Sequence, residues 1–322
     1  MRKIAIYDSF TEPKHRRLID ETAARAGFTV DYYAAPAAVP ADKRGDYEVI
    51  YGMPKPGELK DFVNLKWFCG SFAGVDAYLD DSLYPSPEVM LSNSSGAYGV
   101  TIAEHMVMVT LMLLRHAPAY CADQAAGRWG RVLPMRSIMG STITIVGTGD
   151  IGTEFARRAK AMGAAAVRGV RRTKKAADPA FDEIHTNDEL DALLPDTDIL
   201  ALALPATGET KGFLSAARLA LLPKTAYVVN VGRGTAIDQE ALAEALDAER
   251  IAGAALDVFV PEPLPQDHYL WTTKNLLITP HVAGNMSLGY TRDKDVDMFC
   301  EDLENFAAGR PLAHLVNRKL GY

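Results

Sequence analysis

Residues Thr142 to Gly152 read TITIVGTGDIG, and this stretch predicts the fold of the chain. Thr142 to Val146 is a run rich in β-branched residues, which is typical of a buried parallel strand. Gly147, Gly149 and Gly152 follow with the spacing G-x-G-x-x-G, and helical spacing continues after them. In this fingerprint the first glycine permits a tight turn, the second lets a pyrophosphate approach the backbone, and the third lets the helix pack on the strand. We therefore expect a dinucleotide at the start of this helix.

The start of the helix is itself suited to phosphate, because it offers free N–H groups and the positive end of the helix dipole. Asp150 and Ile151 lie within this turn and are expected to contact the cofactor together with the glycines. The alternative is a glycine-rich turn without a ligand. The preceding strand and the following helix favour the dinucleotide, because they are the context that the fingerprint requires.

Length and composition indicate a globular chain with two domains. The 322 residues suffice for two full cores, and the hydrophobic content of 48% and charged content of 23% are ordinary. We expect no membrane span and no signal peptide, hence a cytoplasmic location, because no apolar run reaches about 18 residues. The net charge of −7 argues against nucleic acid as a partner. Cys69, Cys121 and Cys300 are far apart and predict buried free thiols.

Strands alternate with helical segments in both halves of the sequence. Short apolar runs between Lys3 and Ser92 predict a parallel α/β domain, and the alternation from the fingerprint to Thr279 predicts a doubly wound sheet. The stretch from Thr101 to Leu114 is apolar on most faces, so it predicts a buried helix connecting the domains. Ser287 to Ala308 has helical spacing and is expected to return to the first domain.

The second strand of the predicted nucleotide domain, Ala165 to Val170, is followed by Arg171 and Arg172 and not by an acid. An acid about 20 residues beyond the glycines commonly binds the ribose hydroxyls. A carboxylate there would repel a 2′-phosphate, whereas a guanidinium binds one through charge-assisted hydrogen bonds. We therefore expect NADP(H) in preference to NAD(H), with both arginines on the phosphate. The alternative is that the arginines form a solvated basic loop with the neighbouring lysines.

Three further strand ends carry ionisable residues, and open α/β sheets bind ligands at such ends. Arg233 lies between Gly232 and Gly234, Glu262 lies between two prolines, and His281 follows an apolar strand. Reduction of a carbonyl needs a proton donor near pH 7, which histidine can supply. In a hydride-transfer site Arg233 would polarise the carbonyl, His281 would supply the proton and Glu262 would orient His281. Taken singly, the glutamate could face water in an ordinary turn and the histidine could be structural.

The sequence resembles the D-isomer-specific 2-hydroxyacid dehydrogenases over nearly its whole length. The matching motifs, in the family's order, are GTGDIG from Gly147, LPATGETKGFL from Leu204, VVNVGRGTAID from Val228, ALDVFVPEPLP from Ala255 and ITPHVAG from Ile278. The expected fold is α/β with two domains. A Rossmann-type doubly wound nucleotide domain, 100–286, is inserted into a flavodoxin-like α/β substrate domain formed by 1–99 and 287–322.

The resemblance also implies roles for individual residues. It implies a catalytic Arg233, an orienting Glu262 and an acid/base His281, with Arg233 and His281 contacting both substrate and cofactor. It implies that Asp257 meets the nicotinamide carboxamide. The further cofactor contacts that it implies are Leu204, Pro205, Thr210, Val231, Gly232 and Gly284.

The segment from Ser71 to Gly74 resembles the family's loop for the substrate carboxylate, whose backbone N–H groups bind the acid. The expected contacts are Ser71, Phe72, Ala73 and Gly74. Members often carry glycine where Phe72 stands, so an aromatic ring is expected near the pocket unless Phe72 packs inward. Tyr98 and Trp271 are further candidates for the pocket wall.

Together these features predict NADPH-dependent reduction of a small 2-oxo acid to the D-2-hydroxy acid, with no metal. Glyoxylate, hydroxypyruvate, pyruvate and bulkier 2-oxo acids all remain open as substrates. Arg171 in place of the usual acid resembles the departure that members preferring NADP(H), such as glyoxylate/hydroxypyruvate reductases, tend to share. The resemblance further implies a homodimer, with the Thr101 to Leu114 region in the subunit contact. The alternative is a nucleotide-sensing binding protein, similar to the corepressors that share this fold.

Overall fold

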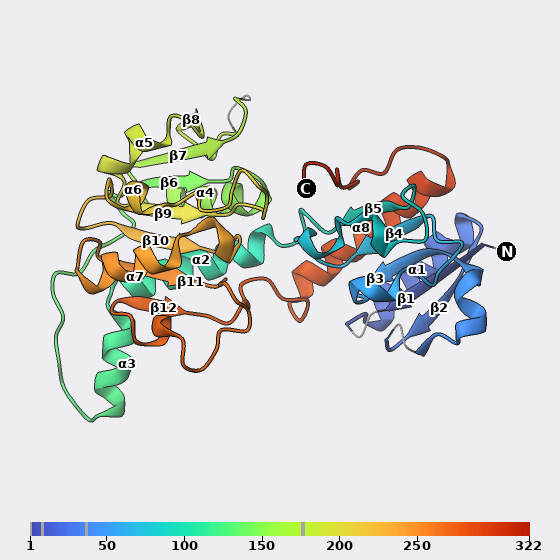
Figure 1. Ribbon diagram of the computed structural model, residues 1–322, viewed down its shortest axis with the longest axis horizontal. Coiled ribbons are helices and arrows are strands. Elements are labelled where there is room, and N and C mark those ends of the chain that lie inside the picture. The colour runs from blue at the N-terminus through green and yellow to red at the C-terminus, as the bar shows by residue number, and fades with distance from the viewer. Residues whose placement is uncertain (1, 8–9, 36–37, 175–177) are drawn as a thin grey trace. The chain divides into compact units, whose positions relative to one another are not determined.

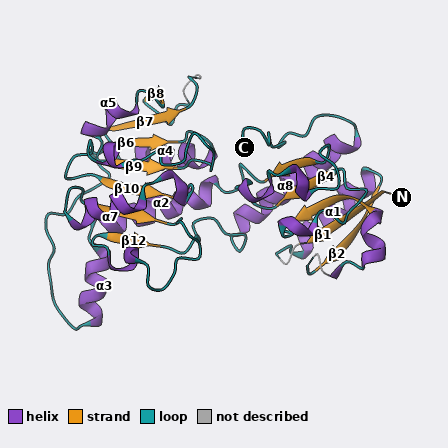
Figure 2. Ribbon diagram, in the orientation of Figure 1, coloured by secondary structure: helices purple, strands orange, loops and turns teal. Residues whose placement is uncertain are grey.

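Two parallel β-sheets, each in its own part of the chain, make up the structure, a computed structural model that describes residues 2–7, 10–35, 38–174 and 178–322 (Figure 1). Met1–Tyr98 and Asn285–Tyr322 form one unit, and Gly99–Gly284 forms the other. Figure 2 shows helices alternating with strands in both. The predicted α/β class is confirmed, with a Rossmann-type nucleotide unit and a second α/β unit.

The second unit is built on a seven-stranded sheet of order β12-β11-β10-β9-β6-β7-β8, in which every described pair is parallel. Its strands are β6 (Thr142–Val146), β7 (Ala166–Arg171), β8 (Glu183–Thr186), β9 (Ile199–Leu202), β10 (Tyr227–Asn230), β11 (Gly253–Leu256) and β12 (Leu276–Ile278). The chain leaves β6 toward β7 and then returns to β9 on the other side. Ligands of open sheets bind at the carboxyl ends of strands around such a reversal.

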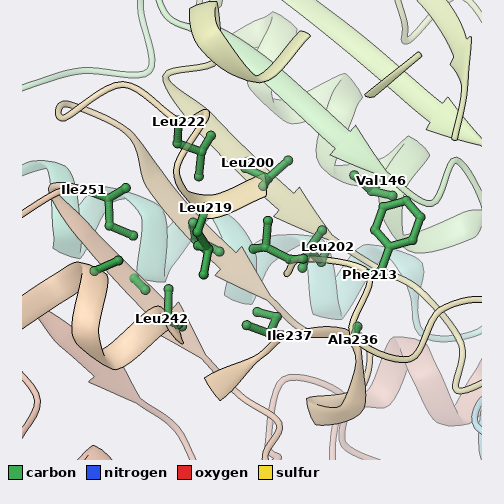
Figure 3. Close-up of a cluster of buried hydrophobic side chains, with 14 of the residues drawn as sticks. Val146, Leu200, Leu202, Phe213, Leu219, Leu222, Ala236, Ile237, Leu242 and Ile251 are labelled. Carbon is green, nitrogen blue, oxygen red and sulfur yellow. The ribbon is translucent and has the colours of Figure 1, made fainter. Parts of the chain in front are cut away.

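Helices cover both faces of this sheet. The helices are α2 (Gly99–Leu114), α3 (Ala117–Ala125), α4 (Asp150–Ala161), α5 (Leu190–Leu193), α6 (Ala216–Leu219) and α7 (Gln239–Asp247). Leucines of α5, α6 and α7 pack on Val146, Leu200 and Leu202 in one buried cluster (Figure 3). Neighbouring strand residues point to the opposite face, where Ile145 meets Gly152 of α4 and where α2 packs on α4.

The first unit is built on a five-stranded parallel sheet of order β2-β1-β3-β4-β5. Its elements are β1 (Arg2–Tyr7), α1 (Pro13–Arg25), β2 (Phe28–Tyr33), β3 (Tyr47–Gly52), β4 (Trp67–Gly70), β5 (Met90–Asn93) and α8 (Gly289–Ala307). Helix α8 packs beside α1, and its Phe299 ring stacks on Tyr51 and Trp67 at centroid distances of 4.1 and 5.5 Å. The last helix therefore completes the core of the first strands.

Two elements were not predicted. Strand β8 reads EIHT, lies at the edge of the sheet beside β7 and is partly exposed, so it lacks the apolar signal of a central strand. Helix α3 follows His116, whose φ of 57° ends the preceding helix, and it has a proline in its first turn. Proline there is compatible with a new helix, because the first N–H groups have no partner within the helix.

No single helix of the described residues is long and apolar enough to cross a membrane, and only α2 with α3, bent by 68°, passes that test as a pair. Cys69 and Cys300 are buried as predicted, and burial raises the pKa of the Cys300 thiol to about 11. The prediction is wrong for Cys121, which is exposed on α3.

Candidate active site

Arg233, Glu262 and His281 follow three adjacent strands of the seven-stranded sheet, namely β10, β11 and β12. The ladder continues past the strand ends, because the Asp257 N–H donates to the Asn230 carbonyl at 3.0 Å and the His281 N–H donates to the Asp257 carbonyl at 2.8 Å. The loops that carry the three side chains therefore start side by side at the carboxyl edge.

Glu262 is bound through both of its oxygens. Oε1 accepts a hydrogen bond from the Phe259 N–H at 2.7 Å, and Oε2 lies 2.7 Å from Nδ1 of His281. An ionised carboxylate only accepts, so Nδ1 carries the proton and Nε2 faces away from the glutamate. Within the described ranges Nε2 of His281 has no hydrogen-bond partner, and the side chain is 49% exposed. This arrangement leaves one ring nitrogen accessible to a reactant.

The backbone of His281 is held in an uncommon conformation. Its φ is +54°, in the left-handed region that few residues other than glycine adopt. The buried carboxylate of Asp257 binds the residues that follow: Oδ1 accepts from the Val282 N–H and Oδ2 from the Ala283 N–H, both at 2.9 Å. Oδ1 also accepts from the Thr279 hydroxyl at 2.6 Å. The turn therefore engages both oxygens of Asp257, a contact set that the resemblance did not imply.

Two glycines allow the Arg233 loop to approach its neighbours. A Cβ at Gly232 would lie 2.6 Å from the backbone N of Leu204, and one at Gly234 would lie 2.3 Å from the backbone C of Phe259. The Asn230 side chain fixes the same loop, because it accepts from the Gly232 N–H and donates to the Arg233 carbonyl, each at 3.0 Å. Arg233 itself is half-buried between these tightly packed segments.

The glycine fingerprint has the geometry that a pyrophosphate requires. Gly147 has a φ of +101°, and a Cβ at Gly152 would lie 1.9 Å from the Gly147 carbonyl oxygen. Apart from its chain neighbours, no described residue has an atom within 4 Å of the Cβ position of Gly149, which precedes the 12-residue helix α4 without a side-chain cap. Since the first N–H groups of a helix have no partner within the helix, this end of α4 is suited to an anion. Ile151 is half-buried, and the Asp150 carboxylate lies against Gly99 at the start of α2.

Arg171 and Arg172 differ in their surroundings. Arg171 ends β7, and its Nε is buried without a hydrogen-bond partner in the described part of the chain. A buried donor without a partner costs about 1–3 kcal/mol, so an anion at this position would be stabilising. Arg172 is 44% exposed, with Nη1 4.0 Å from Glu209. The residues present thus fit a nicotinamide dinucleotide with a phosphate near Arg171.

The remaining cofactor candidates lie in the same unit. Leu204 and Val231 are buried, and Gly284 is the last residue of the unit. The Thr210 hydroxyl donates to the Pro205 carbonyl at 2.6 Å, so it holds the turn after β9. Trp271, a candidate for the wall of the substrate pocket and not for the cofactor site, is exposed, and its indole N–H donates to the Pro265 carbonyl at 2.7 Å.

In the first unit, three carbonyls of the loop from Ser71 to Gly74 are bound, and the Ser71 N–H is occupied because it donates to the Gly52 carbonyl at 3.0 Å. Tyr98 Oη donates to the Ser71 carbonyl at 2.9 Å, Ser94 N–H to that of Phe72 at 3.0 Å, and Asn93 Nδ2 to that of Ala73 at 2.5 Å. Among the described residues, the three N–H groups after Ser71 have no partner. Amides presented in this way form an anion-binding concavity.

Phe72 packs inward. Its ring stacks on Tyr78 with centroids 4.7 Å apart, and it lies so close to Gly70 that a Cβ there would be 2.3 Å from the ring. Of the two orientations that the sequence allowed for Phe72, the structure has the inward one. The ring holds the loop in place through its contact with Tyr78.

Sequence reasoning did not identify Asn93, Thr279 or His105. Asn93 ends β5, and its amide is one of the three groups that bind the loop carbonyls. His105 lies on the largely apolar helix α2, and its Nε2 is 3.3 Å from the Thr279 hydroxyl. A polar residue within an apolar segment is the signal that could have pointed to either.

Comparison with known proteins defines the class. The family described as "D-isomer specific 2-hydroxyacid dehydrogenase, NAD binding domain" matches residues 107–283, more than half of the chain. The chain belongs to the D-isomer specific 2-hydroxyacid dehydrogenases, as its motifs indicated, and is an NAD(P)-dependent oxidoreductase.

Individual members of the family are similar to this chain over most of its length. Glyoxylate/hydroxypyruvate reductase A of Salmonella newport (strain SL254) is 30% identical over 284 residues, 86% of this chain and 88% of the relative. A D-isomer specific 2-hydroxyacid dehydrogenase of Xanthobacter autotrophicus Py2, solved with NADPH and MES, has a TM-score of 0.82 and 31% identity over 100% of this chain and 99% of that one. An NADPH-dependent glyoxylate/hydroxypyruvate reductase of Sinorhizobium meliloti, solved with NADP and sulfate, has a TM-score of 0.81 and 28% identity over 100% of both chains.

Proposed function

We propose that the chain reduces a small 2-oxo acid to its D-2-hydroxy acid with NADPH, and that His281 donates the proton. The observation that carries the proposal is the hydrogen bond of 2.7 Å between His281 Nδ1 and a glutamate whose other oxygen is bound to the Phe259 N–H. It fixes the imidazole with Nε2 accessible, as a general acid requires.

Each group of the chain has a separate part in this reaction. The nicotinamide cofactor supplies the hydride when it is bound. Glu262 keeps the proton of His281 on Nδ1, so that the protonated ring presents its second N–H from Nε2 to the carbonyl oxygen. Arg233 stabilises the negative charge that develops on that oxygen. The amides of Phe72, Ala73 and Gly74 bind the substrate carboxylate.

NADP(H) is the proposed cofactor, in preference to NAD(H). Support comes from the buried Nε of Arg171, which lacks a partner among the described residues, and from the absence of an acid at the end of β7. The complexes of the Xanthobacter and Sinorhizobium proteins with NADPH and NADP support the same preference. Asp257 is proposed to act mainly by holding the turn of His281.

A substitution of His281 tests the reaction. His281→Asn removes the proton donor but keeps a polar side chain, so kcat should fall by about 10²–10⁴-fold while NADPH binding persists. The assay is 2-oxo-acid-dependent NADPH oxidation with glyoxylate, hydroxypyruvate, pyruvate and bulkier 2-oxo acids, repeated with NADH. Full activity of the variant would refute the role of His281. NADPH binding without turnover of any 2-oxo acid by the unsubstituted protein would favour a nucleotide-sensing protein instead.

A homodimer is also proposed. Its support is a set of exposed apolar side chains on α2 and on the segment after α3: Met108, Trp129, Leu133, Met135 and Met139. Apolar surface of this kind commonly marks a contact between protein chains.

A further inference from the structure

Helix α2 carries one imidazole toward the end of the sheet that holds His281. The His105 side chain is only 10% exposed, and its Nε2 lies 3.3 Å from the Thr279 hydroxyl and 3.9 Å from Oδ1 of Asp257. Helix α2 packs on β10 and β11, the strands that precede Arg233 and Asp257. His105 therefore reaches the ends of these strands from outside the sheet.

The direction of the hydrogen bonds follows from the chemistry of each group. Thr279 has a single hydroxyl proton and donates it to Asp257 at 2.6 Å. Its oxygen can then only accept from His105, so Nε2 of His105 carries a proton. Burial lowers the pKa of His105, and the charge of Asp257 opposes this in part. A neutral ring with its proton on Nε2 satisfies all three groups.

The Asp257 carboxylate, which accepts the Thr279 hydroxyl hydrogen bond, also binds the turn that carries His281. Its two oxygens bind the consecutive amides of Val282 and Ala283 at 2.9 Å, and its carbonyl accepts from the His281 N–H at 2.8 Å. His281 has a φ of +54°, a conformation that persists only when its surroundings impose it. Any rotation of the carboxylate would release the amides that impose it.

We propose that His105 is a positioning residue that acts through Thr279 and Asp257 to hold the turn carrying His281. The proposal rests on the proposed function, because it assigns the catalytic proton to His281. A histidine that merely fills the core would contribute to stability without any specific effect on this turn. The tests therefore measure the turn and the reaction separately.

Hydrogen–deuterium exchange of the cofactor-free protein measures the turn. In His105→Ala the Val282 and Ala283 amides should exchange about tenfold faster, because opening of the turn becomes less costly. His105→Gln places an amide donor near the position of Nε2 and should restore slow exchange. Glu104→Gln, at an exposed neighbouring position on α2, is the matched control and should leave exchange unchanged. Unchanged protection in His105→Ala would overturn the proposal.

Kinetics measure the consequence for the reaction. A turn that holds His281 less well should lower kcat about tenfold in His105→Ala, with the Kd of NADPH within about twofold of its original value. His105→Gln should recover most of kcat. If both variants lose activity while the Val282 and Ala283 amides exchange at their original rate, His105 does not act through the turn and the proposal is overturned.

A double-mutant cycle tests the route through Thr279. Thr279→Val removes the hydroxyl at nearly constant volume, so adding His105→Ala should cause little further loss of kcat. Fully additive losses would overturn the proposed route. Activity retained in His281→Asn would instead refute the proposed function, while the exchange data would still report on the link between His105 and the turn.

Discussion

At Gly234 a side chain would collide with the backbone of the neighbouring loop. An added Cβ would lie 2.3 Å from C and 2.4 Å from O of Phe259, whose N–H binds Glu262. Gly234→Ala should therefore cost about 1–3 kcal/mol of unfolding free energy and lower kcat by displacing Glu262. Urea unfolding and steady-state kinetics measure the two effects. Gly208→Ala is the control and should be nearly neutral, because no described residue beyond the chain neighbours of Gly208 has an atom within 4 Å of its Cβ position.

The side chain of Arg171 should determine the preference for NADPH over NADH. Loss of a charge-assisted contact worth about 1.5–3 kcal/mol should raise the Kd of NADPH about 10–100-fold in Arg171→Ala and leave that of NADH unchanged. Fluorescence titration with each cofactor measures this. Lys211→Ala removes an exposed positive charge from the same unit and serves as the control. An equal weakening of both cofactors would contradict a phosphate contact.

Some of these residue contacts could be read from the sequence and others could not. Glu262 and His281 stand at strand ends in recognisable motifs, and the hydrogen bond expected between them is present. His105 lies 174 positions from Thr279, and no local pattern indicates that the two meet. The role of Asp257 could not be foreseen for the same reason, because its oxygens are engaged by amides 25 and 26 residues away.

At the scale of elements, the burial of His105 on α2 should make the stability of the protein depend on pH. Burial lowers the pKa of His105 in the folded chain, so below about pH 6.5 the unfolded state takes up a proton that the folded state does not. Stability should therefore fall as the pH drops from about 6.5 toward the lowered pKa. Urea unfolding at pH 7.5 and 5.5 should show a smaller decrease for His105→Gln than for Glu104→Gln. Equal decreases would contradict this assignment.

Elements with a strong apolar signal were predictable. The runs that form β6 and β10 are almost entirely buried, so their composition is that of central strands. The polar edge strand β8 is stabilised by its pairing with β7, which composition alone does not reveal. Helix α3 is hard to predict, because Pro118 and the polar residues after it are equally typical of the end of a preceding helix.

At the scale of the whole molecule, the proposed dimer predicts a change in mass. Trp129 is 95% exposed and Leu133 is 74% exposed, so burying them between two chains would supply apolar area to an interface. Trp129→Ser combined with Leu133→Ser should convert the dimer to a monomer in light scattering. Val63→Ser removes an exposed apolar residue of the first unit and should leave the mass unchanged. A monomeric unsubstituted protein would refute the dimer.

Helix α8 is synthesised last although it belongs to the core of the first unit, and this affects how that unit folds. The strands of the first unit leave the ribosome long before Phe299 and Leu303, which belong to their core. Residues 99–284 are translated in between, which takes roughly 10–40 seconds at ordinary elongation rates. During that interval the nascent first sheet lacks the cover of α8 and is open to chaperones, whereas the contiguous second unit can fold as it emerges. A premature stop codon ahead of Gly289 would therefore damage the amino-terminal half of the enzyme more than the half nearest the truncation.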